Sequence, residues 1–461
     1  MWEKPNLFGF IQKNRIFFCA FHSFSYLYPP KQLYMKTIRL PLILLAMGVM
    51  TFISCEKEQF DQNVYNEIVD FQFLIDNVDR EHDWLLTHSD TVTIINKTED
   101  IHTVQVLTDN PYLVNNAEIA AEGICFLNEQ KDGYLTTLAY TLPVTQKQAY
   151  IAAKREDGSY IGVASFDVGT DTVNLDIEVM QTVGSFTEPQ PQTFTYLYEE
   201  GFPLPGDFDF NDLVLRISKS ATDRSLQVDL KVTVEAVGAA RSYAAAIHLS
   251  GVKYDDIESV KILEGDAMDK NYPLRRIFID SDKTLLKGRH GEAVINLFES
   301  GHYVMNHELN SIGSIQRLFY NTEKVEREGI SAKVPAVTRT YRINFKNRDV
   351  TRNLSFDQID PFLIQDYNGG LWEIHTYRYK FAEVLKSIYN GKADYYDNHI
   401  SWSIVVPKAD FGYPIETMSL GTYNSKTGET FGPYTSFADW MKDHTQNQDW
   451  YQHTAYPQLL Y

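Results

Sequence analysis

The alternation of residues 225–236, SLQVDLKVTVEA, is the strongest structural constraint in this sequence. Its apolar positions are Leu226, Val228, Leu230, Val232 and Val234, and each of them is followed by a polar side chain. A period of two residues places neighbouring side chains on opposite faces of a β-strand. The segment therefore predicts an antiparallel strand with one buried and one solvated face.

Short segments rich in β-branched and aromatic residues recur along the chain and predict further strands. They are residues 91–95, 103–107, 149–153, 160–166, 337–345 and 401–406. Turn pairs such as Asp132-Gly133 and Asp157-Gly158 separate them. Helix signals are few: residues 383–391, and residues 436–444, where Ser436 could cap the helix and Asp439 suits its first turn. The predicted fold class is mainly β, with antiparallel sheets and few short helices.

A chain of 461 residues is too long for one ordinary core. Residues 188–192, EPQPQ, contain two prolines and no apolar residue, and they read as a linker. We therefore expect two β-sandwich-like domains, at residues 80–187 and 188–461. No repeat, nucleotide-binding loop or low-complexity tract is present in the sequence.

The segment that begins at Met35, MKTIRLPLILLAMGVMTFISC, has the pattern of a secretory signal. Its apolar part is shorter than the about 20 residues that a membrane-spanning helix needs. We expect translation to begin at Met35, so residues 1–34 are interpreted as a non-native extension. The signal peptide is then residues 35–54, and residues 55–79 form a tether.

The end of this signal, Phe52 to Cys55, resembles a bacterial lipobox, with a small residue before the cysteine. In such lipoproteins the cysteine sulfur carries a diacylglycerol, and several acyl chains together give stable membrane anchoring. The alternative is an ordinary signal peptide with a chance cysteine. The lipobox predicts lipidation at Cys55 and a location at the cell outer membrane. Acidic Glu56 and Glu58 after the cysteine are compatible with export to the cell surface.

The charge and cysteine content exclude several classes of protein. A net charge of −19 disfavours nucleic-acid binding, which needs a basic face. The three cysteines offer no CxxC pair and no disulfide framework, and Cys125 is expected to be a small core residue.

GxSxG and HExxH motifs are absent from the sequence. His302 and His307 are five residues apart and would not share a helix face, so we expect them and Glu308 to be loop or surface residues.

The stretch GDFDFNDLVLRI, residues 206–217, gathers four oxygen-bearing side chains before an apolar strand. They are Asp207, Asp209, Asn211 and Asp212. In an extended chain three of them would share one side, whereas in a tight loop they could surround one point. Oxygen ligands without His or Cys favour a hard cation, and Ca²⁺ tolerates irregular loops. The alternative is that these residues form turns and bond to their own backbone.

The longer segment YEEGFPLPGDFDFNDLVLRI resembles the signature of the LruC domain of bacterial lipoproteins, which has a GDxDxND core. Residues 290–299, residues 359–375 and the C-terminal run from Trp402 resemble further family segments in order. The segment after His375 departs from the family, because TYRYKFAEV replaces a Leu-Pro-Gly stretch. The resemblance covers residues 190 to 461. It implies an outer-membrane or surface lipoprotein of unassigned function, without an enzymatic activity to carry over.

A related acidic motif in secreted adhesin-like domains adds to the expectation of calcium. Glu199, Glu200, Glu373 and Glu416 are lower-order candidates for the same ion site. Three functions remain open. The first is a non-enzymatic, calcium-binding surface protein whose β-sandwich binds an extracellular glycan or protein ligand. The second is a purely structural component of the envelope, and the third is a glycan hydrolase that uses Asp207 and Asp209.

Overall fold

The structure, a computed structural model, describes most of the chain after residue 77. The chain forms two compact units. The units are residues 1–72 with 424–429, and residues 73–423 with 430–461. The elements below belong to the second unit, apart from β1 (Phe71–Gln72) and the last residue of β24 (Thr422–Asn424). The described residues are 71–72, 78–182, 187–200, 207–221, 226–272, 283–307, 319–323, 326–327, 330–367, 370–376, 401–424 and 427–461. The helix predicted at residues 383–391 lies outside them.

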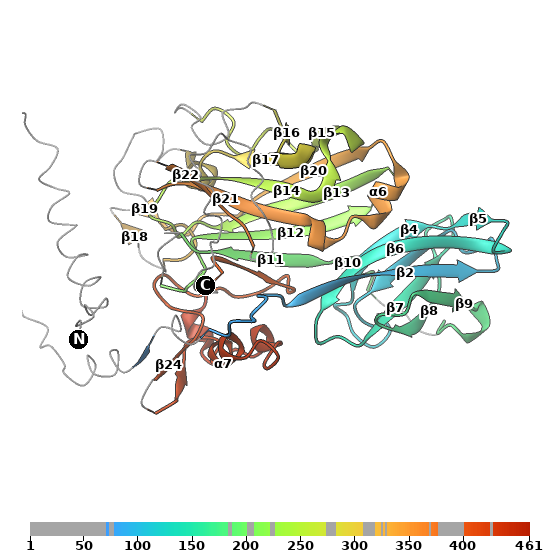
Figure 1. Cartoon of the computed structure of the whole chain (residues 1–461), viewed down its shortest axis with the longest axis horizontal. Helices are drawn as coiled ribbons and strands as arrows, with labels where there is room; N and C mark the ends of the chain where they lie inside the picture. Colours follow the sequence, from blue (N-terminus) through green and yellow to red (C-terminus); the bar gives the residue numbers. More distant parts are fainter. Residues whose placement is uncertain are drawn as a thin grey trace, which may run out of the picture. The chain divides into compact units, whose positions relative to one another are not determined.

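The first part of the second unit contains two sheets (Figure 1). One has the strand order β10-β4-β3-β7-β8 and the other β5-β6-β2-β9. The strands are β2 (Thr87–Asn96), β3 (Thr103–Leu107), β4 (Glu118–Ile124), β5 (Phe126–Asn128), β6 (Gly133–Pro143), β7 (Gln148–Lys154), β8 (Tyr160–Asp167), β9 (Thr172–Leu175) and β10 (Gln190–Pro191). A 3-10 turn, η2 (Ile177–Val179), follows β9. The four strands predicted in this region are β2, β3, β7 and β8.

Two larger sheets follow in the sequence. Their orders are β15-β20-β13-β12-β11-β23 and β16-β17-β14-β21-β22. The first contains β11 (Thr193–Tyr198), β12 (Leu213–Ala221), β13 (Gln227–Ala236), β15 (Ile257–Ile262), β20 (Val337–Phe345) and β23 (Ser403–Val406). The second contains β14 (Tyr243–Lys253), β16 (Leu285–Lys287), β17 (Glu292–Phe298), β21 (Ile359–Tyr367) and β22 (Gly370–Ile374). Neighbouring strands within these two sheets pair antiparallel.

The remaining elements are short. Two small hairpins are β18 (Glu326–Arg327) with β19 (Ile330–Ser331), and β24 with β25 (Thr430–Phe431). The described α-helices are α4 (Gly301–Met305), α6 (Arg348–Asn353) and α7 (Phe437–Lys442). The 3-10 turns are η3 (Tyr254–Asp256), η4 (Arg289–Gly291), η5 (Phe356–Gln358), η6 (Trp450–Gln452) and η7 (Pro457–Leu459). The helix predicted around residues 436–444 is α7, with Asp439 in its first turn. Ser436 is the N-cap, but its side chain makes no capping hydrogen bond.

The alternating residues 225–236 include strand β13, and the apolar face of this strand is buried. Val228, Leu230, Val232 and Val234 are at most 2% exposed, and Lys231 on the other face is exposed. β13 pairs with β12 on one side and with β20 on the other (Figure 1). The predicted strand is confirmed because its period matches a sheet with one packed face.

Each pair of sheets encloses an apolar cluster, as the predicted β-sandwich class requires. One cluster contains Val92 and Ile94 of β2 together with Val104 of β3 and Ile151 of β7. The larger one joins side chains of β13 to those of β14, β17 and β21. The mainly β fold is therefore confirmed.

The predicted linker at residues 188–192 is not simply a connection. Gln190 and Pro191 form β10, which pairs in parallel with Glu118 and Ile119 of β4. Extended backbone suits a proline on an edge strand, because a proline has no N–H to donate inside a sheet. The predicted domain boundary at residue 188 stays a prediction.

Candidate functional site

The GDFDFND loop enters β12 through a curled backbone. Phe208 and Phe210 have φ angles of 60° and 51°, a left-handed conformation that side chains other than glycine rarely adopt. Both rings are buried in the larger apolar cluster. The structure therefore shows the curled alternative for this loop and not an extended strand.

The polar side chains of the loop bind a segment about two hundred residues further along the chain. Oδ2 of Asp209 accepts a hydrogen bond of 2.8 Å from the backbone N–H of Thr417. Nδ2 of Asn211 donates to the carbonyl of Pro414 at 3.0 Å. The φ of Thr417 is also positive, at 65°. The loop and the segment 414–417 thus hold each other in sparsely populated conformations, which in proteins concentrate at functional sites.

A third segment brings the next carboxylate to the loop. Glu199 directly follows β11, and its Oε1 accepts a 2.7 Å hydrogen bond from the backbone N–H of Phe210. One carboxylate oxygen from each of Glu199, Asp209 and Asp212 lies within 4.8 Å of the other two. Their residues are 3%, 1% and 7% exposed. We name this group the acidic site; it contains two of the four predicted ligands and one lower-order candidate.

Two backbone N–H groups donate hydrogen bonds to the carboxylate of the neighbouring Glu200. Its carboxylate accepts hydrogen bonds from the N–H groups of Ala240 and Arg241, at 3.2 and 2.9 Å. Its own N–H donates to the carboxylate of Asp212. Glu200 therefore fixes the position of Asp212 and contributes negative charge.

The remaining predicted ligands have different places. Asp207 is partly buried, and its charge acts on all three carboxylates of the acidic site. Oε2 of Glu416 accepts a 3.1 Å hydrogen bond from Thr322, and its charge acts on Asp209. Glu373 lies in β22 beside His375, with 3.2 Å between Oε2 and Nε2. Glu373, a lower-order candidate for the ion site, therefore belongs to another cluster.

Asn211 leaves one buried oxygen without a hydrogen-bond partner among the residues that the structure describes. The side chain is fully buried, and its Nδ2 is already used, so Oδ1 is the unpartnered atom. A Cβ atom on Gly238 would stand 2.4 Å from this oxygen and 3.1 Å from Oε2 of Glu416. Only glycine leaves the space beside Asn211 open. The sequence gives no signal for this role of Gly238.

The electrostatics of the acidic site are unfavourable without a positive charge. Burial raises the pKa of Glu199, Asp209 and Asp212, and repulsion from neighbouring carboxylates raises each pKa further. Buried carboxylates at this separation must hold protons or a cation. Every side-chain atom of the acidic site that could bind a metal ion is an oxygen. The site therefore suits a hard cation.

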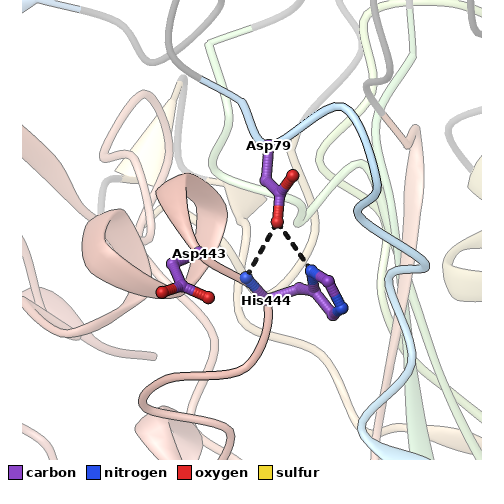
Figure 2. Close-up of side chains that lie close together, drawn as sticks. All are labelled: Asp79, Asp443 and His444. Atoms are coloured by element: carbon purple, nitrogen blue, oxygen red, sulfur yellow. Dashed lines mark hydrogen bonds and ion pairs between the residues drawn. The ribbon is translucent and has the colours of Figure 1, made fainter.

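A second group of ionisable side chains consists of Asp79, Asp443 and His444, and it joins two segments that are far apart in the sequence (Figure 2). Oδ2 of Asp79 faces both Nδ1 and the backbone N–H of His444, at 2.6 and 3.4 Å. Asp443 completes the group, but its carboxylate accepts hydrogen bonds from Thr445 and Gln446. Hydrogen bonds from neighbouring groups already satisfy these two carboxylates. We therefore interpret the cluster as an ion pair between Asp79 and His444. Sequence reasoning missed it because each residue alone resembles a surface residue.

The structure corrects the expectation for His302. It lies in α4 and is 2% exposed, with its ring centroid 6.3 Å from those of Tyr243 and Tyr320. His307 is exposed, as expected, and stacks on Tyr303 at 4.4 Å. Glu308 lies outside the described residues, as do Cys55 and the signal segment. Cys125 is buried, as predicted.

Among the residues that the structure describes, no helix is both long and apolar enough to cross a membrane.

Comparisons with known proteins give one family match and one similar crystal structure. Residues 224–451, slightly less than half of the chain, match a family described as a domain of unknown function (DUF4842). The matched range begins after the GDFDFND loop. A crystal structure described as that of a "Putative lipoprotein" from Bacteroides ovatus is similar over 79% of this chain and 99% of that chain, with a TM-score of 0.44 and 15% sequence identity. No curated protein matches the chain.

Proposed function

We propose that this protein is a lipid-anchored component of the cell envelope whose acidic site binds Ca²⁺. The ion supports a β-sandwich that binds a glycan or protein partner outside the cell, and the protein is not an enzyme. The observation that carries the ion proposal is the buried group of Glu199, Asp209 and Asp212, whose carboxylates lie within 4.8 Å of one another.

The unpartnered Oδ1 of Asn211 adds independent support for a cation. A buried oxygen without a donor costs about 1–3 kcal/mol, and a cation would remove that penalty. A cation bound beside Asn211 would satisfy this oxygen and neutralise the carboxylates at the same time.

Calcium fits this ligand set better than the common alternatives. Zn²⁺ sites use Cys or His, and no such residue belongs to the acidic site. Mg²⁺ demands near-octahedral geometry, whereas Ca²⁺ accepts six to eight oxygens in irregular loops. The strained backbone at Phe208 and Phe210 is an irregular loop of this kind.

The anchoring proposal rests on the sequence of residues 35–58. Diacylglycerol on Cys55 and further acylation of the new N-terminus would give several buried chains, at about 0.8 kcal/mol per CH₂ group. The resemblance of the segment from Tyr198 to Ile217 to the LruC signature supports the same placement on the outer membrane, exposed at the surface. Tyr377, Tyr379, Tyr395 and Tyr396, which could stack on sugar rings, lie outside the described residues.

Thermal unfolding and calorimetry of the chain from Glu56 to Tyr461 test the ion. After treatment with a chelator, millimolar Ca²⁺ should raise the Tm by several degrees, because ligand at about 100 times Kd contributes about 2.7 kcal/mol. Asp209→Asn should abolish both the rise and the binding heat. The matched control Asp410→Asn, at an 87% exposed side chain, should change neither.

A further readout keeps the test decisive if the substitution alters stability. Without Ca²⁺, Asp209→Asn removes one of several mutually repelling charges, so its Tm should equal or exceed that of the calcium-free parent chain. A parent chain that gives no binding heat and no change in Tm at millimolar Ca²⁺ would refute the ion. Binding to a glycan array then separates a ligand-binding protein from a purely structural one.

A further inference from the structure

A row of alternating carboxylates and imidazoles crosses one face of the sheet β16-β17-β14-β21-β22. Glu292 begins β17, His248 lies in β14 and Asp360 lies in β21. His248 and Asp360 are direct cross-strand partners. Glu373 of β22 and His375, just after it, complete the row. Neighbouring strands thus place five ionisable side chains in sequence.

The contacts along the row are short at its ends and long in the middle. Nε2 of His248 lies 2.8 Å from Oε2 of Glu292. On the other side, Nδ1 of His375 lies 2.6 Å from Oδ2 of Asp360, and Nε2 lies 3.2 Å from Glu373. Between Nδ1 of His248 and Oδ2 of Asp360 the distance is 3.5 Å. This central gap interrupts the short contacts of the row.

Nδ1 of His248 lies at this gap without a hydrogen-bond partner among the described residues. The carboxylate on the other side of the gap, that of Asp360, has one oxygen, Oδ1, that also has none. His248 is 5% exposed, and Asp360 is fully buried. Buried polar atoms are normally satisfied, so an unsatisfied imidazole nitrogen next to a carboxylate with an unsatisfied oxygen points to a bound group.

The hydrogen bonds at either end determine what kind of group fits. Because Glu292 can only accept, Nε2 of His248 donates to it, and Nδ1 is the ring nitrogen that faces the carboxylate of Asp360. With Nδ1 deprotonated, the nitrogen and the carboxylate both offer only lone pairs, and a cation between them would bind to both.

The partners at the ends match the supporting shell of a metal site. Metal-binding histidines usually donate their other ring N–H to a carboxylate, as His248 does to Glu292. Carboxylate ligands are likewise held by hydrogen bonds, as Asp360 is by His375. Imidazole nitrogen with carboxylate oxygen is the ligand set of Zn²⁺ and related first-row ions, whereas Ca²⁺ takes oxygen alone.

We propose that the gap is a second metal site, which binds a divalent transition-metal ion of the Zn²⁺ class through Nδ1 of His248 and the carboxylate of Asp360. Glu292 and His375 position the two ligands, and water completes the coordination. The site lies on different residues from the acidic site, so the proposal does not depend on calcium binding.

Calorimetry with Zn²⁺ and visible absorption with Co²⁺ test this site in the chain from Glu56, saturated with Ca²⁺. One ion should bind, and a bound Co²⁺ should show the absorption of a site with nitrogen and oxygen ligands. His248→Ala and Asp360→Asn should each weaken binding at least 100-fold. Glu292→Gln changes only a supporting partner and should weaken it about 10- to 100-fold.

Further variants separate this site from binding elsewhere on the chain. His444→Gln removes the other described histidine–carboxylate pair with a distance of 2.6 Å, and it should leave Zn²⁺ binding unchanged. If His248→Ala fails to fold, Glu292→Gln still tests the proposal. The Glu292 side chain is 19% exposed at the edge of the row, so this substitution should leave the fold intact. Absence of Zn²⁺ binding to the parent chain, or binding that survives in both Glu292→Gln and Asp360→Asn, would overturn the proposal. In either case a proton or a water molecule fills the gap.

Discussion

Asp79 and His444 are 365 residues apart in the chain, and Oδ2 of Asp79 lies 2.6 Å from Nδ1 of His444 (Figure 2). The backbone N–H of Asp79 also donates to the carbonyl of Met441, at 2.8 Å. Close by, Nε2 of His82 lies 3.1 Å from the carbonyl oxygen of Trp440. The last residue of the predicted tether, Asp79, and nearby His82 are therefore fastened to α7 and the residues after it.

The contribution of this ion pair should depend on pH. The hydrogen bond with His444 lowers the pKa of Asp79 to about 2, and the same bond raises the pKa of His444. The lowered pKa gives stability that is present above the unfolded value near 4 and is lost as the pH falls toward 2. The raised pKa gives stability that is present below about 6.5 and is lost at higher pH.

Asp79→Asn should therefore lower the free energy of unfolding most between about pH 4 and 6.5, by roughly 0.5–1 kcal/mol for a partly exposed pair. The measurement is a series of urea-unfolding curves from pH 4 to 9. Asp132→Asn, at a fully exposed side chain paired with Lys97, is the control and should show no such window. An equal loss at pH 5 and pH 9 would contradict the ion-pair interpretation.

Gly238→Ala should weaken the acidic site as well as the fold. The new Cβ would stand 2.4 Å from Oδ1 and 2.9 Å from the backbone oxygen of Asn211. Such overpacking costs about 1–3 kcal/mol, and displacement of Asn211 should weaken Ca²⁺ binding measured by calorimetry. Gly158→Ala is a suitable control, because its Cβ meets nothing within 4 Å and its cost comes from a φ of 83° alone. Unchanged Ca²⁺ affinity in Gly238→Ala would argue against Asn211 as a ligand.

Trp440→Ala should destabilise the C-terminal region strongly. Trp440 is fully buried, and its ring centroid lies 5.6 Å from that of Trp84 and 5.8 Å from that of Trp450. Removal of a buried aromatic side chain costs about 3–5 kcal/mol, which a lower midpoint of urea unfolding would reveal. Leu127→Ala, at a side chain that is 62% exposed, should leave the midpoint almost unchanged. A loss below about 1 kcal/mol in Trp440→Ala would contradict the packing described for this cluster.

Cys55→Ser should release the protein from the membrane fraction, since it removes the sulfur that carries the diacylglycerol. Cell fractionation and the mass of the mature N-terminus measure this. Cys125→Ser is the matched control: Cys125 is buried in the fold, and its substitution should leave the protein in the membrane fraction. A Cys55→Ser protein that stays membrane-bound would refute lipid anchoring at this residue.

The sequence alone determined the features that depend on local periodicity and local chemistry. The alternation from Val228 to Val234 is a property of neighbouring residues, and it predicted β13 and its buried face. The composition of the GDFDFND loop likewise predicted a concentration of carboxylates. A period of two requires no knowledge of the partner strand, because successive side chains of any β-strand point to opposite faces.

The tertiary structure decided which distant residues meet. Glu199 joins Asp209 and Asp212 only because β11 pairs with β12, and Asn211 meets Pro414 only where the C-terminal segment returns to the loop. His248 and Asp360 lie side by side only through the register of β14 and β21. A shift of one residue in that register would move one of the two side chains to the opposite face. Register and chain return follow from the packing of the whole molecule, which no single segment of the sequence contains.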